Sequence, residues 1–147
     1  MEKSEKQYRY AEWLSADEMH RESLDWLSEL HFCADEQTFL NGLVKSYTLQ
    51  LTDKSIFAKS KKLVTELLDH EKELVKLLEL VQAHERLLQI MIDDIDQIKM
   101  EKAYVETHID LTKDIHRYLV GYRDLKKKMF SLLSGIMRSQ KQKRLLN

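Results

Sequence analysis

The chain has 147 residues, of which 33 % are charged, with no proline, three glycines and a formal net charge of −1. This composition is typical of long helices and excludes folds that depend on proline- or glycine-rich turns. The single cysteine excludes an internal disulfide, and no uncharged apolar run is long enough to span a membrane. We therefore predict one all-α domain in a cytoplasmic protein.

Residues 1–14 combine charges with aromatic side chains and are predicted to form a leader or a short helix. Ser15 then begins a capping box, because Glu18 follows three residues later. From this cap, apolar residues recur at alternating steps of three and four as far as Leu51. The spacing predicts a first helix over residues 16–51, within a single bundle domain over 15–147.

A short pattern on this first helix combines aromatic and acidic residues at fixed spacing: Trp26-Leu27-Ser28-Glu29-Leu30-His31-Phe32, then Asp35-Glu36 and Phe39-Leu40. It resembles the W-x-x-E-L-x-F-x-x-D-E-x-x-F pattern of a group of small, uncharacterised helical proteins from Bacteroidetes-type bacteria. The resemblance covers about fifteen residues and implies a helical bundle. It carries no catalytic residues over to this chain.

Asp53 or Ser55 is predicted to cap a second helix over residues 55–92. Its apolar residues alternate in threes and fours, with two steps occupied by polar residues: Leu63, Leu67, Leu74, Leu77, Val81, Leu88 and Met91. A break near 82–84 is an alternative that would give four helices instead of three. We place the second turn near residues 93–96.

The third helix is predicted over residues 95–138, with Asp94 as its N-cap and Gln97 three residues later. The apolar residues along one side of this helix, here called its seam, again alternate in steps of four and three: Leu111, Ile115, Tyr118, Tyr122, Leu125, Met129, Leu132 and Ile136. Residues 138–144 have lost the apolar pattern and are expected to fray.

The second helix is apolar over about half its circumference, so it requires two or more neighbouring helices. We therefore predict an elongated, antiparallel, coiled-coil-like three-helix bundle. Phe32, Phe39 and Leu43 form a second stripe off the first seam. Either the bundle interior or a second chain must bury this stripe, and we expect a homodimer.

No histidine has a glutamate three residues before it, and no H-E-x-x-H motif is present, so the familiar bundle metal sites are absent from the sequence. An up-down-up topology nevertheless places His70, His116, Cys33 and Glu36 in one layer. Three interpretations remain open: a zinc site, a polar layer with Gln37 that fixes helix register, or exposure of these side chains to solvent. We predict no cofactor and no catalytic residue.

Charges are sorted along the chain, and residues 112–147 carry 10 basic and 2 acidic side chains. In the predicted topology the end of the first helix, the start of the second and the end of the third meet at one basic pole. The candidate anion-binding residues at this pole are Lys59, Lys61, Lys62, Lys126, Lys127, Lys128, Arg138 and Lys141. The helix dipole does not account for lysines at the start of a helix.

The sequence therefore predicts a non-enzymatic helical interaction or scaffold protein that binds a protein partner or a second copy of itself. The alternative is an electrostatic binder of nucleic acid or an anionic phospholipid surface through the basic pole. A metal-binding bundle is the third hypothesis.

Overall fold

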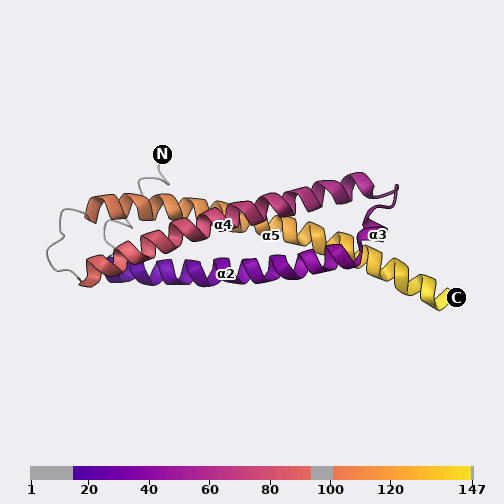
Figure 1. Cartoon of the computed structure of the whole chain (residues 1–147), viewed down its shortest axis with the longest axis horizontal. Coiled ribbons are helices and arrows are strands. Elements are labelled where there is room, and N and C mark those ends of the chain that lie inside the picture. Colours follow the sequence, from indigo (N-terminus) through magenta and orange to yellow (C-terminus); the bar gives the residue numbers. More distant parts are fainter. Residues whose placement is uncertain (1–14, 94–100, 147) are drawn as a thin grey trace. The chain divides into compact units, whose positions relative to one another are not determined.

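The computed structural model describes residues 15–93 and 101–146, apart from the side chain of Glu101. It contains four helices: α2 (Ala16–Ser46), α3 (Thr48–Leu51), α4 (Phe57–Asp93) and α5 (Glu101–Leu146) (Figure 1). Helix accounts for 94 % of the described residues, with no strand among them, which confirms the all-α fold class. The predicted leader and the predicted cap at Asp94 and Gln97 lie outside the described residues.

The start of α2 matches the prediction from the capping box. The Ser15 hydroxyl accepts a hydrogen bond of 3.1 Å from the backbone N–H of Glu18. The Ser15 carbonyl accepts a further bond from Met19, and Asp17 and Glu18 place negative charge in the first turn. These contacts satisfy N–H groups that have no partner inside the helix, so the helix begins here.

The predicted first helix is interrupted at Tyr47, where α2 ends and the short α3 begins. On either side, hydroxyl groups donate to carbonyls one turn earlier: Ser46 to Gly42 at 3.0 Å, and Thr48 to Val44 at 2.9 Å. Such bonds can bend a helix, but Thr38 and Thr65 form the same bond inside uninterrupted parts of α2 and α4. The bonds of Ser46 and Thr48 therefore accompany the interruption and do not by themselves explain it.

Helix α4 follows a tight turn fixed by Asp53, whose carboxylate accepts hydrogen bonds from the Ser55 backbone at 2.9 Å and hydroxyl at 2.8 Å. The helix then runs without interruption from Phe57 to Asp93. The alternative break near 82–84 is therefore wrong. The fourth helix arises instead at Tyr47.

Helix α5 continues to Leu146, beyond the predicted end near residue 138. The added residues are mostly Lys, Arg, Gln and Leu, which favour helix, with no proline or glycine among them. Lys143 and Arg144 in the last turn also complement the negative end of the helix dipole. These residues are exposed, so helix propensity and charge maintain the end of α5 without burial.

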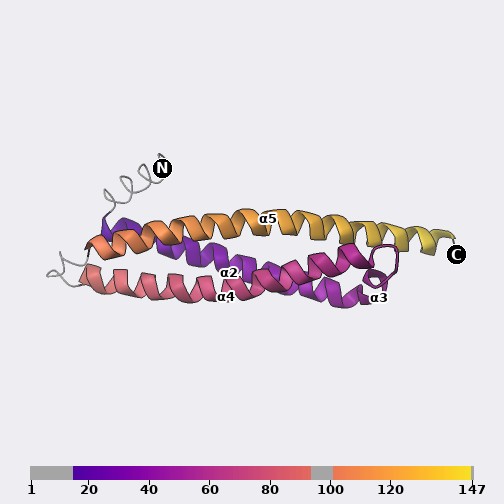
Figure 2. The same ribbon diagram turned by 90° about the horizontal axis from the view of Figure 1, so that it is seen from above.

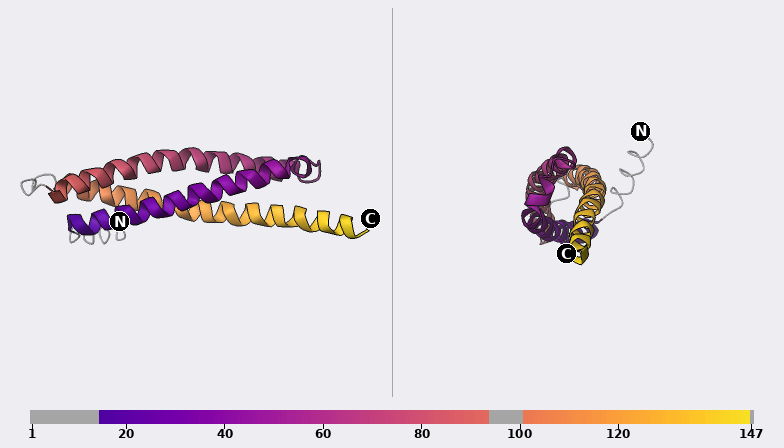
Figure 3. Two further views of the ribbon diagram at one scale, coloured as in Figure 1. Left: turned by 60° about the horizontal axis from the view of Figure 1, so that its bottom comes forward. Right: turned by 90° about the vertical axis from the view of Figure 1, so that its right-hand side faces the viewer.

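The residues group into two compact units. Unit 1 comprises Met1–Phe32 and Leu74–Tyr118, and unit 2 comprises Cys33–Glu73 and Leu119–Asn147. Within each unit, one segment each of α2, α4 and α5 lie side by side, and α4 runs antiparallel to the other two (Figures 2 and 3). Unit 2 also contains α3.

Each unit has its own apolar cluster. In unit 1 the cluster consists of Met19, Leu88, Met91 and Tyr104. In unit 2 it is larger: Leu40, Leu51, Leu63, Leu67, Leu125, Met129, Leu132, Leu133 and Ile136. Every apolar seam position predicted for the second helix is buried, as are all those predicted from Leu111 to Ile136. The period of three and four therefore identified the core correctly.

The second predicted stripe on α2 is mostly exposed. Phe32 is 64 % and Phe39 is 60 % exposed, whereas Leu43 packs against the unit 2 cluster. That a second chain covers this stripe remains a prediction. None of the helices in the described part of the chain is both long enough and apolar enough to cross a membrane.

Candidate functional site

The two units have opposite charge. Among the described residues, unit 1 contains 6 basic and 12 acidic side chains, and unit 2 contains 14 basic and 8 acidic ones. All eight candidate anion-binding residues belong to unit 2, where α4 contributes three and α5 contributes five. Unit 2 is therefore the basic part of the molecule.

The three adjacent lysines of α5 are not equivalent. Lys126 is half-buried, and its ammonium group lies 3.2 Å from both oxygens of Glu36. Lys128 forms a 3.0 Å ion pair with Asp124, and this hydrogen bond raises the pKa of Lys128. Lys127 is exposed and forms no ion pair with any residue that the structure describes. Only one of the three is thus available to a partner without breaking an internal contact.

Lys127 begins a polar row along the outer side of α5. The row, here called the basic face, consists of Lys127, Ser131, Ser134, Arg138 and Lys141, spaced four, three, four and three residues apart. Its three cations are exposed, and Phe130 lies beside it. A shallow depression lined only by α5 residues runs along part of this face. Cations and hydroxyls at this spacing can bind several anionic groups along one helix.

The other three candidates lie near the start of α4. Lys59, Lys61 and Lys62 are all exposed, and no acidic residue occupies the first turn of this helix. The positive end of the helix dipole makes this an unfavourable place for cations. Helix stability therefore does not explain their presence.

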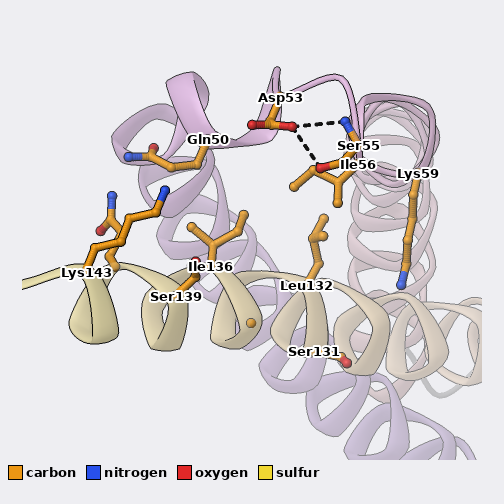
Figure 4. A pocket seen from close by; sticks show the side chains of 12 residues that line it. Gln50, Asp53, Ser55, Ile56, Lys59, Ser131, Leu132, Ile136, Ser139 and Lys143 are labelled. Atoms are coloured by element: carbon orange, nitrogen blue, oxygen red, sulfur yellow. Dashed lines mark hydrogen bonds between the residues drawn. The ribbon is translucent and has the colours of Figure 1, made fainter. Parts of the chain in front are cut away.

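Between α3, the turn before α4 and α5, unit 2 contains an open hollow of about 400 Å³ (Figure 4). Ile56, Leu132 and Ile136 contribute an apolar floor, while Lys59 and Lys143 stand on opposite sides of it. The hollow is further lined by Gln50, Asp53, Ser55, Ser131, Gly135, Ser139 and Gln140. It combines apolar surface with positive charge.

The predicted polar layer is only partly formed. Glu36 accepts hydrogen bonds from Lys126 and, at 3.3 Å, from the Tyr122 hydroxyl. The His70 ring lies 6.5 Å from the Tyr122 ring, and its Nδ1 donates to the Glu66 carbonyl at 2.9 Å. The α5 residue in this layer is therefore Tyr122. The sequence had indicated His116, six residues earlier.

His116 is exposed on α5, whereas Cys33 is buried on α2. Across residues 15–93 and 101–146, no three side chains of His, Cys, Asp or Glu come together in a way that could hold a metal ion. Hydrogen bonds already engage Glu36 and His70, which favours the interpretation as a polar layer between helices.

Unit 1 contains a buried pair of histidines that sequence analysis did not identify. His84 is 2 % and His108 is 1 % exposed, and Nε2 of His84 lies 2.9 Å from Nδ1 of His108. The Trp26 ring stacks on His108 with ring centroids 4.5 Å apart. On the other side of His108, Oε1 of Glu22 lies 3.5 Å from Nε2.

Burial lowers the pKa of His84 from 6.5 to about 4, and burial together with the neighbouring His84 lowers the pKa of His108 from 6.5 to about 4. Both rings are therefore neutral at neutral pH, so one donates the shared hydrogen bond and the other accepts it. Burial also raises the pKa of Glu22, with additional effects of Glu18 and Asp25.

The sequence did contain a signal for this pair. His84 occupies a step of three after Val81 and four before Leu88 on the α4 seam. On α5, His108 stands three residues before Leu111 and therefore continues that seam towards the N-terminus. The α4 seam was predicted with a polar residue at this step, and the α5 seam was predicted only from Leu111 onward, because both seams were traced through apolar residues.

Comparison of the chain with protein-family models, with curated proteins and with solved structures finds no match.

Proposed function

We propose that this chain is a non-enzymatic helical interaction protein that binds an anionic partner through the basic face of α5. The observation that carries the proposal is the composition of residues 119–146, which contain eight basic side chains and only one acidic one. The single acidic residue, Asp124, pairs with Lys128, and the cations of the basic face are left directed to solvent. Such a surface attracts polyanions and binds them in a salt-dependent way.

The geometry supports contact with a surface and not with a single base or ring. Phe130 is the one aromatic residue beside the basic face, so successive stacking of bases has little support. Binding through Lys127, Arg138 and Lys141 would be independent of sequence and would involve phosphate, sulfate or carboxylate groups.

Heparin chromatography tests this proposal with matched charge changes. The double variant Lys127→Glu and Arg138→Glu should elute at much lower salt than the unmodified chain. The control variant carries Lys76→Glu and Arg86→Glu, two exposed positions on α4 in unit 1. Both variants change the net charge equally. A difference between them in the salt concentration at elution therefore reports a local effect of the basic face.

Equal elution of the two double variants would contradict the proposal, because total charge would then account for retention. The same pair of variants can be compared on anionic phospholipid vesicles and on double-stranded DNA. A preference for one of these polyanions would identify the class of partner.

A second candidate is self-association between unlike units. The described part of unit 1 has a balance of −6 and that of unit 2 a balance of +6, so unit 1 of one copy can attract unit 2 of another. Light scattering after size exclusion should then show an assembly at low salt that dissociates at high salt. A constant monomer mass at all salt concentrations would reject this candidate and leave the first one intact.

A further inference from the structure

We infer that the hollow lined by α3, the turn before α4, and α5 binds an amphiphilic anion: a carboxylate head group on an apolar chain. This goes beyond the proposed function, because the ligand is a small molecule and the hollow shares only Ser131 with the basic face. All of its residues belong to unit 2.

The floor of the hollow is the outer edge of the unit 2 apolar cluster, where Leu132 and Ile136 each retain 8 % exposure. Leu132 and Ile136 belong to that cluster, and Ile56 packs against it (Figure 4). Gly135 lines the hollow between them, and a Cβ atom built at this glycine meets no atom within 4 Å. The space above the floor is therefore open, and an apolar chain placed there would cover surface that otherwise contacts water.

The charges beside the floor determine which head group the hollow can accept. Hydrogen bonds from the backbone and hydroxyl of Ser55 lower the pKa of Asp53, and Lys143 lowers it slightly further, so the charges of Asp53 and Lys143 partly offset one another. Lys59 stands on the opposite side of the floor and has no ion-pair partner in the described part of the chain (Figure 4). The uncompensated charge is positive and next to apolar surface, so the geometry favours an anionic head group near Lys59.

The volume of the hollow, about 400 Å³, lies at the lower end of the range of small-molecule sites. This volume is sufficient for a medium-length chain. On the side of Lys143, the Gln50 side chain and the Ser139 hydroxyl supply polar groups that limit how far an apolar chain can extend. The class of ligand is therefore a medium-chain carboxylate.

The test is a titration of the full chain with sodium decanoate, below its aggregation concentration and at constant ionic strength. Backbone amide signals in a two-dimensional NMR spectrum report the binding position, and calorimetry reports the affinity. We expect the shifted signals to be concentrated at Ile56, Ser131 and Gly135. Decanol, which has the same chain without the charge, should bind more weakly.

Two pairs of variants make the result specific. Gly135→Leu fills the hollow and should weaken decanoate binding by about tenfold or more. Gly42→Leu is its control, because Gly42 is also a helical glycine of unit 2 with open space around it, but it lies outside the hollow. Lys59→Gln should weaken decanoate binding and leave decanol binding unchanged, whereas Lys62→Gln should affect neither.

Three results would overturn the inference. The first is decanoate binding that survives Gly135→Leu or that is lost equally in Gly42→Leu. The second is equal affinity for decanol and decanoate, which would show that Lys59 does not select an anion. The third is no shift of the hollow's amide signals at millimolar decanoate. Circular dichroism of each variant verifies that the helices are intact.

Discussion

Nε2 of His84 lies 2.9 Å from Nδ1 of His108, and both rings are almost completely buried in unit 1. A ring that accepts at Nδ1 carries its proton on Nε2. If His84 donates, Nε2–H of His108 is directed towards Glu22, whose Oε1 is 3.5 Å away. The polar groups of His84, His108 and Glu22 thus bring α4, α5 and α2 together, with a hydrogen bond between the two rings and a longer approach to Glu22.

The histidine pair predicts that stability falls in mild acid. The folded-state pKa of each ring is about 4, against 6.5 for an unperturbed histidine. The unfolded chain therefore binds more protons between these values, so stability is greatest above pH 6.5 and declines as pH falls towards 4. At about 1.4 kcal/mol per pKa unit, we expect each ring to contribute a loss of roughly 3 kcal/mol by pH 4, measured by urea unfolding at several pH values.

The control for this prediction is the double variant His84→Leu and His108→Leu, which removes both titrating groups. Its stability should depend much less on pH between 6.5 and 4. The raised pKa of Glu22 acts in the opposite direction, since this carboxyl gains a proton more readily in the folded state as pH falls. A wild-type chain with constant stability over this range would contradict the neutral, buried state of the pair.

Two leucines on α4 test the assignment of the buried side. Leu77 is 5 % exposed and Leu80 is 54 % exposed, although they are three residues apart. Leu77→Ala should reduce the free energy of unfolding by roughly 2–5 kcal/mol, because it removes buried contacts. Leu80→Ala should change it by less than about 1 kcal/mol. Similar losses in both variants would mean that the outer side of α4 is also covered.

The layer around Glu36 and His70 predicts no specific response to zinc. Lys126 and Tyr122 already bind Glu36, and a metal ion would have to displace them. We expect the melting temperature to be the same with added zinc and with a chelator. Elemental analysis that finds one metal ion per purified chain, absent from a His70→Ala variant, would contradict this prediction.

Glycine substitutions test the packing around α2 and α5. A Cβ atom at Gly42 meets nothing within 4 Å, so Gly42→Ala should stabilise the chain by about 0.5–1 kcal/mol through helix propensity. At Gly121 the Cβ atom would lie 3.4 Å from Nε2 of His70. Gly121→Ala should therefore be tolerated with a smaller gain. Thermal unfolding of the two variants measures the difference, and a large loss at Gly121 would indicate that His70 cannot move.

Periodicity predicted the buried side of the helices but not their interruption or register. The alternation of three and four residues identified the core of α4, because residues at this spacing lie on one side of the helix. That side is buried whichever helix packs against it. The break at Tyr47 has no signal in that pattern, because the apolar positions continue through it to Leu51. Similarly, periodicity does not fix how far one helix slides along another, so His116 was chosen in place of Tyr122.

The candidate site was predictable to the level of charge but not of individual side chains. Net charge along the sequence identified the basic segments of α4 and α5, and both segments lie in unit 2. The different environments of Lys126, Lys127 and Lys128 depend on partners such as Glu36, which is distant in the sequence. The hollow beside Lys59 likewise requires residues from three separate segments.

The most direct test of the proposed interaction is the salt dependence of binding to a heparin oligosaccharide, measured by calorimetry on the full chain. Electrostatic binding through the basic face predicts weak binding at low salt that disappears by a few hundred millimolar salt, where the Debye length falls to about 5 Å. It also predicts a shallower dependence on salt for the Lys127→Glu, Arg138→Glu variant. Binding that is independent of salt, or that is unchanged in this variant, would contradict it.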